Sequence, residues 1–182
     1  DDGGLGMGHV EAGIVLEEIG RNLTPSPFLT SSVLAGTALK HGSADLKGRY
    51  LPGRIAGEAV YAVAIDETAK HRPSRITTKA EKSGIGFKLS GSKSFVSLGA
   101  SSDMIVVAAR TSGADEDDDG ITLFAVPKDA ANMTQDAVRL VDSSVASHIT
   151  FDGVDLDGEA VIGEVDGGRE VLNAMLTAGR LG

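Results

Sequence analysis

Two short groups of residues in this sequence could do chemistry. The first is a cationic cluster of Lys70, His71, Arg72 and Arg75, which follows an apolar segment at 61–65. Fixed cations at the end of a strand attract phosphoryl oxygens, and arginine can bind them through two parallel hydrogen bonds. A phosphate site is therefore one interpretation. The other is a solvated loop in which charges happen to cluster, and the residue types alone favour the loop.

The second group consists of Ser92, Ser94 and Ser97, which surround Phe95. Serines in such a position are usually turn and edge residues of a sheet. A serine next to an aromatic residue at a strand end can also hydrogen-bond one edge of a flat cofactor, while the ring covers the cofactor's face. Both interpretations remain open at the level of these residues.

Composition excludes several other kinds of chemistry. The chain contains no cysteine, which removes disulfides, thiolate zinc sites, iron–sulfur clusters and cysteine nucleophiles. It also lacks a phosphate-binding P-loop, a nucleophile elbow and a His-Glu pair at metal spacing. The acidic run at 115–119 predicts a solvated hairpin loop, because neighbouring like charges repel and the ligand spacing of a calcium loop is absent. We predict no metal site.

The charge balance bears on partners and location. With 17 basic and 26 acidic residues, the 182-residue chain carries a formal net charge of −9. A diffuse acidic surface repels phosphate backbones and anionic lipid, so we expect no nucleic-acid partner and no attachment to such membranes. No basic start precedes an apolar run, and no stretch reaches the length of a membrane span. The sequence predicts a soluble, cytoplasmic protein without a membrane span.

The first quarter of the chain has helical periodicity. Ala12, Val15, Leu16 and Ile19 repeat at helical spacing, and Gly20 is placed to end that helix. A second helix is expected from Pro27 to about Lys40, with Ser26 as its cap. A third begins at Ser43 and ends before Pro52.

After Gly57 the pattern changes to period two, with β-forming residues between glycine turns. The expected strands cover residues 61–65, 76–81, 86–90, 94–97, 104–110, 121–126, 137–140, 147–152 and 160–162. The continuous apolar run at 104–109 predicts a central strand that is covered on both faces. Many short strands of this kind indicate a β-sandwich or barrel.

The last residues again have helical spacing. Val171, Ala174, Met175 and Ala178 form one apolar stripe, which requires a partner surface. The glycine-rich start and this helical ending lead us to expect a larger protein with both flanks missing. Stripes at both ends also predict an oligomer.

At this point the order of motifs resembles the acyl-CoA dehydrogenase family. The segment from Gly3 to Gly6 and the helix ending Glu17-Glu18-Ile19-Gly20 look like the family's GGLG…EE(I/L)G. Residues 89–97 resemble its L-x-G-x-K-x-W-I-(T/S) strand. Residues 151–154, Ile162-Gly163 and Gly167-Gly168 are similar to its F-x-x-V…(I/L)G…G-x-G ending. The resemblance extends over essentially all of the chain.

The resemblance implies an α+β fold: a helical N-terminal segment, an antiparallel β-sandwich or barrel middle domain, and the start of a C-terminal helix. The implied division is 1–57, 58–163 and 164–182. It also implies FAD-dependent α,β-dehydrogenation of an acyl-CoA thioester in fatty acid and lipid degradation, with electron-transfer flavoprotein or a similar acceptor as partner. The enzyme is expected as a homo- or hetero-oligomer.

The family's motifs also imply site residues. Phe95 replaces the family's Trp, Val96 replaces the Ile and Ser97 keeps the hydroxyl, so these three residues are expected to contact the flavin. The family's T-E-P-G-A-G-S-D segment corresponds to residues 65–72, where its glycines have become Thr68 and Lys70. The full set of cofactor-binding residues implied in this way is Ala64, Ile65, His71, Phe95, Val96 and Ser97.

The substrate and the catalytic base are implied less directly. His71, Thr177 and Arg180 correspond to positions near the acyl-CoA. The family's catalytic Glu lies beyond residue 182 or immediately before the Arg, where this chain has Gly179. This fragment therefore holds no candidate base, and by itself it is expected to be inactive.

Two other functional hypotheses stay open beside the enzyme. One is a flavin-deficient, non-catalytic partner subunit of a hetero-oligomeric acyl-CoA dehydrogenase, which the altered segment at 65–72 motivates. The other is a free-standing β-sandwich binding module. The acyl substrate, whether of a given chain length, branched or steroid, is not encoded in these residues.

Overall fold

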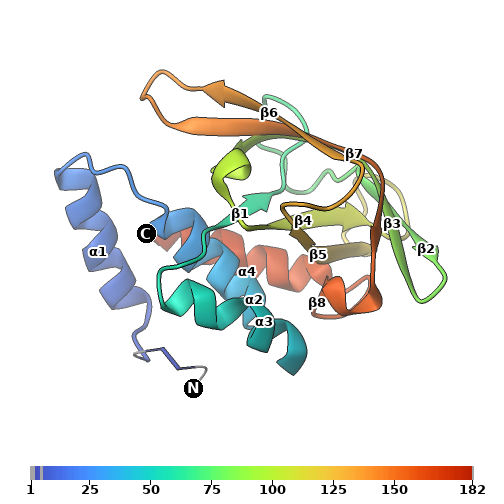
Figure 1. Cartoon of the computed structure of the whole chain (residues 1–182), viewed down its shortest axis with the longest axis horizontal. Coiled ribbons are helices and arrows are strands. Elements are labelled where there is room, and N and C mark those ends of the chain that lie inside the picture. Colours follow the sequence, from blue (N-terminus) through green and yellow to red (C-terminus); the bar gives the residue numbers. More distant parts are fainter. Residues whose placement is uncertain (1–2, 5, 182) are drawn as a thin grey trace.

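The chain forms an α+β structure in which helices pack on one face of a curved sheet (Figure 1). The computed structural model describes residues 3, 4 and 6–181, so Leu5 of the glycine motif and Gly182 lie outside it. The helices are α1 (His9–Arg21), η1 (Phe28–Ala35), α2 (Gly36–Leu39), α3 (Ala44–Ile55), η2 (Gly99–Ser101), η3 (Gly158–Ala160) and α4 (Gly168–Leu181). The strands are β1 (Tyr61–Ala64), β2 (Lys79–Ser83), β3 (Gly86–Ser97), β4 (Met104–Arg110), β5 (Ile121–Pro127), β6 (Met133–Arg139), β7 (Val145–Leu156) and β8 (Val161–Ile162).

The boundaries of the N-terminal helices differ from expectation in three places. Helix α1 continues past Gly20 and ends at Arg21, and its C-cap residue Asn22 donates a side-chain amide hydrogen bond to the Glu18 carbonyl at 2.9 Å. The single helix expected from Pro27 is a π-helical turn, η1, followed by α2. Helix α3 continues through Pro52 to Ile55, because burial of Leu46 and Leu51 outweighs the proline penalty in the last turn.

The sheet has eight strands and is mostly antiparallel. Its order is β6-β7-β3-β2-β4-β5-β8, and β1 pairs in parallel with β4. Every residue of β4 is buried, which confirms the central strand that the apolar run predicted. Side chains alternate along this strand between two separate hydrophobic clusters, one on each face.

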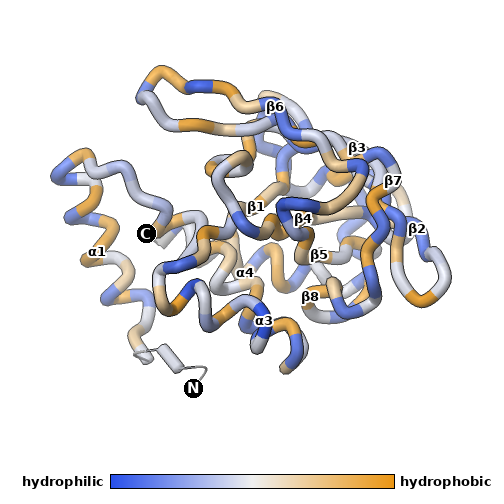
Figure 2. The backbone as a smooth tube through the Cα atoms, viewed as in Figure 1, coloured by the Kyte–Doolittle hydropathy of each residue, from blue (hydrophilic) through white to orange (hydrophobic). Residues whose placement is uncertain are grey.

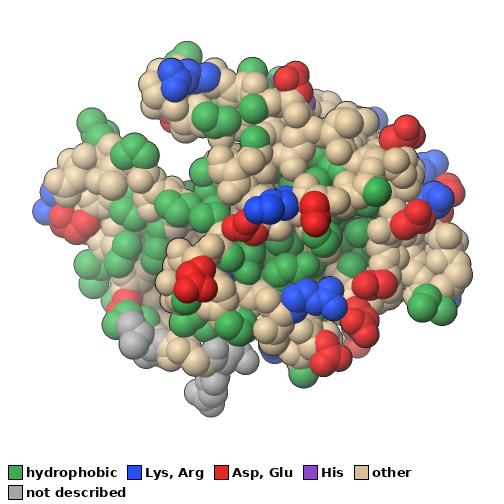
Figure 3. Space-filling view, in the orientation of Figure 1, with side chains coloured by type: hydrophobic (Ala, Val, Ile, Leu, Met, Phe, Trp, Pro, Cys, Tyr) green, Lys and Arg blue, Asp and Glu red, His purple; other side chains and the backbone are tan. Residues whose placement is uncertain are grey.

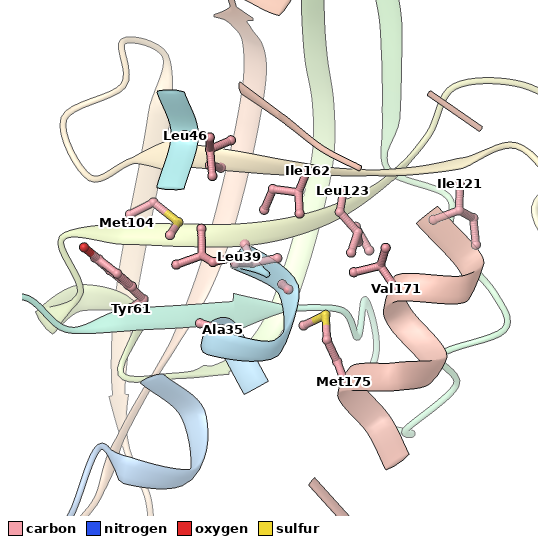
Figure 4. Close-up of a cluster of buried hydrophobic side chains, with 14 of the residues drawn as sticks. Ala35, Leu39, Leu46, Tyr61, Met104, Ile121, Leu123, Ile162, Val171 and Met175 are labelled. Atoms are coloured by element: carbon pink, nitrogen blue, oxygen red, sulfur yellow. The ribbon is translucent and has the colours of Figure 1, made fainter. Parts of the chain in front are cut away.

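The first cluster lies between the helices and the sheet. Met104 of β4, Leu39 of α2, and Val171 and Met175 of α4 all belong to this cluster (Figure 4). The C-terminal apolar stripe therefore finds its partner surface within the chain itself, because Val171, Met175 and Ala178 are all buried. This cluster fixes α4 against the sheet and so positions the residues on its outer face.

The second cluster lies on the opposite face, where the sheet folds over on itself. Ile105 of β4 and Phe124 of β5 meet Leu89 of β3 and Phe151 of β7 there. Phe87 adds an edge-to-face contact with Phe124 at 5.2 Å between ring centroids. Packing of two sheet layers around one apolar interior confirms the sandwich-like middle domain.

Several strand bounds differ from expectation; the strand expected at 137–140, for example, is β6 and begins at Met133. The segments expected at 86–90 and 94–97 form one long strand, β3, whose pairing with β7 shifts register between Leu89 and Ser90 and again between Lys93 and Val96. The strand expected from Ile76 begins only at Lys79. The reason is that the backbone N–H groups of Thr77 and Thr78 donate to the Glu67 carboxylate instead of to a neighbouring strand.

Helix α1 stands apart from the rest of the structure. It has no fully buried residue, and Val10, Ile14 and Val15 are exposed. Apolar and polar segments alternate along the tube in this part of the chain (Figure 2), and hydrophobic side chains gather on the surface where α1 lies (Figure 3). Among the helices that the structure describes, none is both long enough and apolar enough to cross a membrane.

Candidate functional site

A β-bulge in β3 presents the aromatic residue that the sequence singled out. Lys93 lies opposite Ile149 of β7 and Val96 lies opposite Ser147, so Ser94 and Phe95 together face the single residue His148. An extra residue of this kind shifts the phase of the strand by one position. Phe95 and Ser97 are therefore exposed on either side of buried Val96. We call Phe95 and Ser97 the slot edge.

The backbone at Phe95 is in an unusual conformation. Its φ is +54°, in the left-handed region that residues with a side chain rarely adopt. The residue is 49% exposed, and its ring meets the His148 imidazole edge to face, with 5.2 Å between centroids and an interplanar angle of 69°. Conformational strain at a half-exposed aromatic residue is typical of functional sites.

Three of the other predicted cofactor residues, Ala64, Ile65 and Val96, are less exposed than the slot edge. Ala64 and Val96 are buried in the second hydrophobic cluster, so their side chains support the site from behind. Ile65 is half-buried and leans against the first cluster. Its carbonyl accepts a hydrogen bond of 2.9 Å from the Lys93 ammonium. The side chains of Ala64 and Val96 are therefore not available to a ligand at this edge.

The cationic cluster occupies the turn at 66–75, which begins beside the slot edge. Ser94 of β3 donates its backbone N–H to the Asp66 carbonyl at 2.8 Å. Nδ1 of His71 lies 2.7 Å from Oδ2 of Asp66, and Arg72 donates its backbone N–H to the same carboxylate at 2.9 Å. His71 itself is exposed. Asp66 therefore orients the imidazole and leaves its outer nitrogen toward solvent.

A second cation of the cluster already has carboxylate neighbours. The Arg75 guanidinium lies 3.7 Å from an oxygen of Asp115 and 3.7 Å from one of Glu116. The acidic hairpin loop thus partly neutralises the cationic turn. Lys70 and Arg72 have no carboxylate within ion-pair distance among the described residues. These two side chains and His71 are the groups of the turn best placed to meet an anion.

Sequence reasoning missed the buried ion pair that joins the turn to β3. Lys93 is fully buried, and its ammonium lies 2.9 Å from Oε1 of Glu67. The Glu67 carboxylate also accepts from the Thr77 hydroxyl and from the backbone N–H groups of Thr77 and Thr78. A signal was present, because Lys93 has the same period-two phase as the apolar residues Phe87 and Leu89.

Burial disfavours the charged form of both partners, with different outcomes. For Lys93 burial prevails over the attraction of Glu67 and lowers the pKa to about 8. For Glu67 the Lys93 charge and the hydrogen bonds from Thr77, Lys93 and Thr78 together outweigh burial and lower the pKa to about 2. Both groups are therefore charged at neutral pH.

The predicted substrate residues Thr177 and Arg180 lie on the outer face of α4. They line a groove of about 510 Å³ together with Pro73, Ser74, Asp118, Arg169, Asn173 and Leu176. The groove thus brings α4 close to the end of the cationic turn. Arg169 was missed by sequence reasoning. It donates to the carbonyls of Pro73 at 3.2 Å and Ser74 at 3.3 Å, and so ties α4 to this turn.

The acidic loop is organised by a buried arginine. Arg110 is only 4% exposed, and its guanidinium donates to the carbonyls of Ile76, Asp115, Asp117 and Asp119. The loop therefore turns its carbonyls inward and its carboxylates toward solvent. No group of three or more potential metal ligands occurs among the described residues.

The position before Arg180 has no room for a longer side chain. A Cβ added at Gly179 would lie 2.7 Å from Cδ2 of Leu34, so a carboxylate there would require Leu34 to move. The buried carboxylate of Glu67 is saturated with hydrogen bonds. Neither position supplies a free carboxylate for proton abstraction.

Comparisons with known proteins agree on one family. The family model described as acyl-CoA dehydrogenase, middle domain, matches residues 66–154, and the model of the N-terminal domain matches residues 1–58. Cyclohex-1-ene-1-carbonyl-CoA dehydrogenase of Geobacter metallireducens is 28% identical over 187 residues, which cover 98% of this chain and 49% of that protein.

Solved structures show the same relationship. A structure titled "Tcur3481-Tcur3483 steroid ACAD" superposes with a TM-score of 0.88 at 30% identity, over 99% of this chain and 47% of that one. A glutaryl-CoA dehydrogenase from Mycobacterium smegmatis in complex with FADH2 gives a TM-score of 0.86 at 26% identity, over 99% and 47%. The chain spans about half the length of the relatives it matches. On its sequence, its fold and the two matching domain models, it belongs to the acyl-CoA dehydrogenase family.

Proposed function

We propose that this chain is the N-terminal and middle part of an FAD-dependent acyl-CoA dehydrogenase, an oxidoreductase that acts on the α,β carbon–carbon bond of an acyl-CoA thioester. The observation that carries the proposal is the β-bulge that turns Phe95 and Ser97 outward on one edge of β3. Family membership supplies the chemical class. The proposed division into domains is 1–57, 58–163 and 164–182.

The residues of the slot edge fit a flavin. The exposed Phe95 ring offers an apolar surface to one face of the isoalloxazine, and the Ser97 hydroxyl can hydrogen-bond its rim. Buried Val96 holds these two residues in place. Lys70 and Arg72 offer cationic groups to the diphosphate, and the exposed His71 imidazole offers a ring nitrogen. FAD supplies the hydride acceptor when bound, and the relative from M. smegmatis, solved with FADH2, supports this assignment.

The groove beside α4 fits the acyl-CoA. Arg180 lies along it and carries positive charge for a phosphate, and Thr177 adds a hydroxyl. The relative from G. metallireducens is named for an acyl-CoA substrate, which supports this class. We assign the proton-abstracting carboxylate to a part of the protein outside this chain, and we expect the isolated chain to be inactive.

We propose that the protein is an oligomer and passes electrons to an electron-transfer flavoprotein or a similar acceptor. The exposed apolar residues of α1, which include Val10, Ile14 and Val15, favour burial against another surface. The charge of −9 is compatible with a protein in solution in the cytoplasm.

The test uses the full-length polypeptide that contains this chain. Purified protein should be yellow, and its visible flavin absorption should bleach when an acyl-CoA is added without oxygen, because reduced flavin loses that absorption. A panel of straight-chain, branched, cyclic and steroid acyl-CoA thioesters would identify the substrate. Protein that stays colourless in excess FAD would contradict the proposal.

A second candidate is the non-catalytic partner subunit of a hetero-oligomeric acyl-CoA dehydrogenase. Two observations favour it. The turn at 66–75 is closed by side-chain contacts of Asp66, Glu67 and His71 in place of glycine-shaped backbone. The steroid dehydrogenase structure at 30% identity has a title that names two components. Co-expression with a candidate partner separates the two proposals. One FAD per pair of chains, retained when Phe95 of this chain is replaced by Glu, indicates the partner subunit.

A further inference from the structure

One buried carboxylate closes the turn at 66–75 and attaches it to β3. Glu67 lies at the start of this segment, whereas Thr77 and Thr78, which donate three hydrogen bonds to it, lie just beyond its end. Lys93 adds a fourth bond from β3 and uses a second N–H for the Ile65 carbonyl, both at 2.9 Å. Three separate segments of the chain therefore meet at the Glu67 side chain.

Ser94 extends this attachment by one residue toward the bulge. Its backbone N–H donates to the Asp66 carbonyl at 2.8 Å, and its hydroxyl donates to the Glu67 carbonyl at 3.2 Å. The bulge that exposes Phe95 begins directly after Lys93. The contacts of Lys93 and Ser94 thus fix the spacing between the slot edge and the cationic turn.

Neither member of the ion pair can meet a ligand itself. Lys93 has no exposed surface, and the Glu67 side chain is 9% exposed with hydrogen bonds on both of its oxygens. A buried ion pair contributes little to stability when compared with apolar side chains of similar size, although it favours one geometry over others. A role in geometry therefore explains this pair better than a role in stability.

We infer that Lys93 and Glu67 are positioning residues of the cofactor site, which hold the slot edge and the cationic turn at the separation that an isoalloxazine and its diphosphate require. This inference rests on the proposed function. It predicts that cofactor affinity depends on the pair even in a variant in which stability has been recovered.

The experiment compares Lys93→Met with the double variant Lys93→Met/Glu67→Gln in the full-length protein. The single variant leaves a buried carboxylate without its cation, so its unfolding midpoint in denaturant should fall most. The double variant removes that uncompensated charge, and its midpoint should recover in part. Its FAD dissociation constant should nevertheless be raised about tenfold or more, because the turn is no longer tied to β3.

Lys88→Met is the matched control. Lys88 is on the same strand but is exposed, and its ammonium lies 3.5 Å from Asp155. This variant should keep both the unfolding midpoint and the FAD affinity of the wild type. FAD binding is followed by the quenching of flavin fluorescence, which does not require turnover.

The outcomes separate the inference from the proposed function. Wild-type protein that binds no FAD overturns both. Wild-type protein that binds FAD, with a double variant that binds it equally well, overturns the positioning role alone. Should the double variant fail to fold, Thr77→Val removes only the hydroxyl bond to Glu67. It should raise the FAD dissociation constant about threefold, and an unchanged constant overturns the inference.

Discussion

Phe95 of β3 and His148 of β7 form an edge-to-face pair across a β-bulge, with ring centroids 5.2 Å apart. His148 is the single residue of β7 that faces both Ser94 and Phe95. The pair thus fixes the direction of a ring whose backbone has a φ of +54°. The residue that we propose covers the flavin therefore has a strained backbone and a side chain held by a neighbouring ring.

The backbone strain at Phe95 predicts that truncation of this residue to glycine destabilises the protein less than truncation to alanine, which reverses the usual order. Phe95→Gly should be more stable than Phe95→Ala by about 1 kcal/mol, because glycine adopts the left-handed conformation without a steric penalty. Both variants should bind FAD more weakly than the wild type, because both lack the ring. Chemical denaturation and FAD titration measure the two effects. An alanine variant as stable as the glycine variant would show that the left-handed conformation is not retained in solution.

The contact between Phe95 and His148 predicts coupling between the two side chains. A double-mutant cycle of Phe95→Ala and His148→Ala should give an interaction free energy of about 1 kcal/mol in unfolding, as is usual for aromatic pairs. Asp136 lies opposite His148 on β6 and serves as the control. A cycle of Phe95→Ala with Asp136→Asn should be additive. Additivity in the first cycle as well would mean that the rings do not interact.

The low pKa of Glu67 predicts the acid sensitivity of the fold. This pKa is about 2 against an ordinary value of 4.5, so between these pH values the unfolded chain binds a proton that the folded chain does not. The contribution of ionised Glu67 to the free energy of unfolding should therefore be fully present above pH 4.5. It should be lost as the pH drops toward 2, by a total on the order of 3 kcal/mol.

Denaturant unfolding as a function of pH measures this effect. Glu67→Gln should be less stable than the wild type at neutral pH. Its free energy of unfolding should also fall less steeply with decreasing pH in the acid range, which we call the acid limb, because the titrating group is gone. Glu116→Gln is the control, since Glu116 is an exposed residue of the acidic loop. Its acid limb should match that of the wild type. Equal slopes for all three proteins would assign the acid limb to other carboxylates.

The buried Arg110 guanidinium predicts a large loss on truncation. Arg110→Met removes the guanidinium donor of four inward-facing carbonyls, and those of Ile76 and Asp119 have no other donor among the described residues, so the free energy of unfolding should fall by about 3 kcal/mol or more. Arg75→Met is the control, because Arg75 makes only long contacts to Asp115 and Glu116 and should change stability by less than about 0.5 kcal/mol. Equal effects of the two variants would contradict the inward arrangement of the loop.

Local sequence signals determined much of the architecture. The continuous apolar run of β4 requires that both faces of this strand be covered, and every residue of the strand is buried in the structure. The apolar stripe of Val171 and Met175 requires an apolar partner surface, which the first hydrophobic cluster supplies. The order of several weak motifs identified the family, because each motif reflects a local backbone conformation that is set by neighbouring residues. Phe95 and Ser97 were predicted as cofactor contacts in the same way.

Only the tertiary structure decided how these pieces lie relative to one another. The phase of β3 at Phe95 depends on a bulge that is set by its pairing with Ser147 and Ile149, which lie some fifty residues later in the chain. The partnership of Lys93 with Glu67, and of Arg169 with the carbonyls of Pro73 and Ser74, likewise joins segments far apart in sequence. Period and propensity act over a few neighbouring residues, whereas burial and hydrogen-bond partners are fixed by packing across the whole chain.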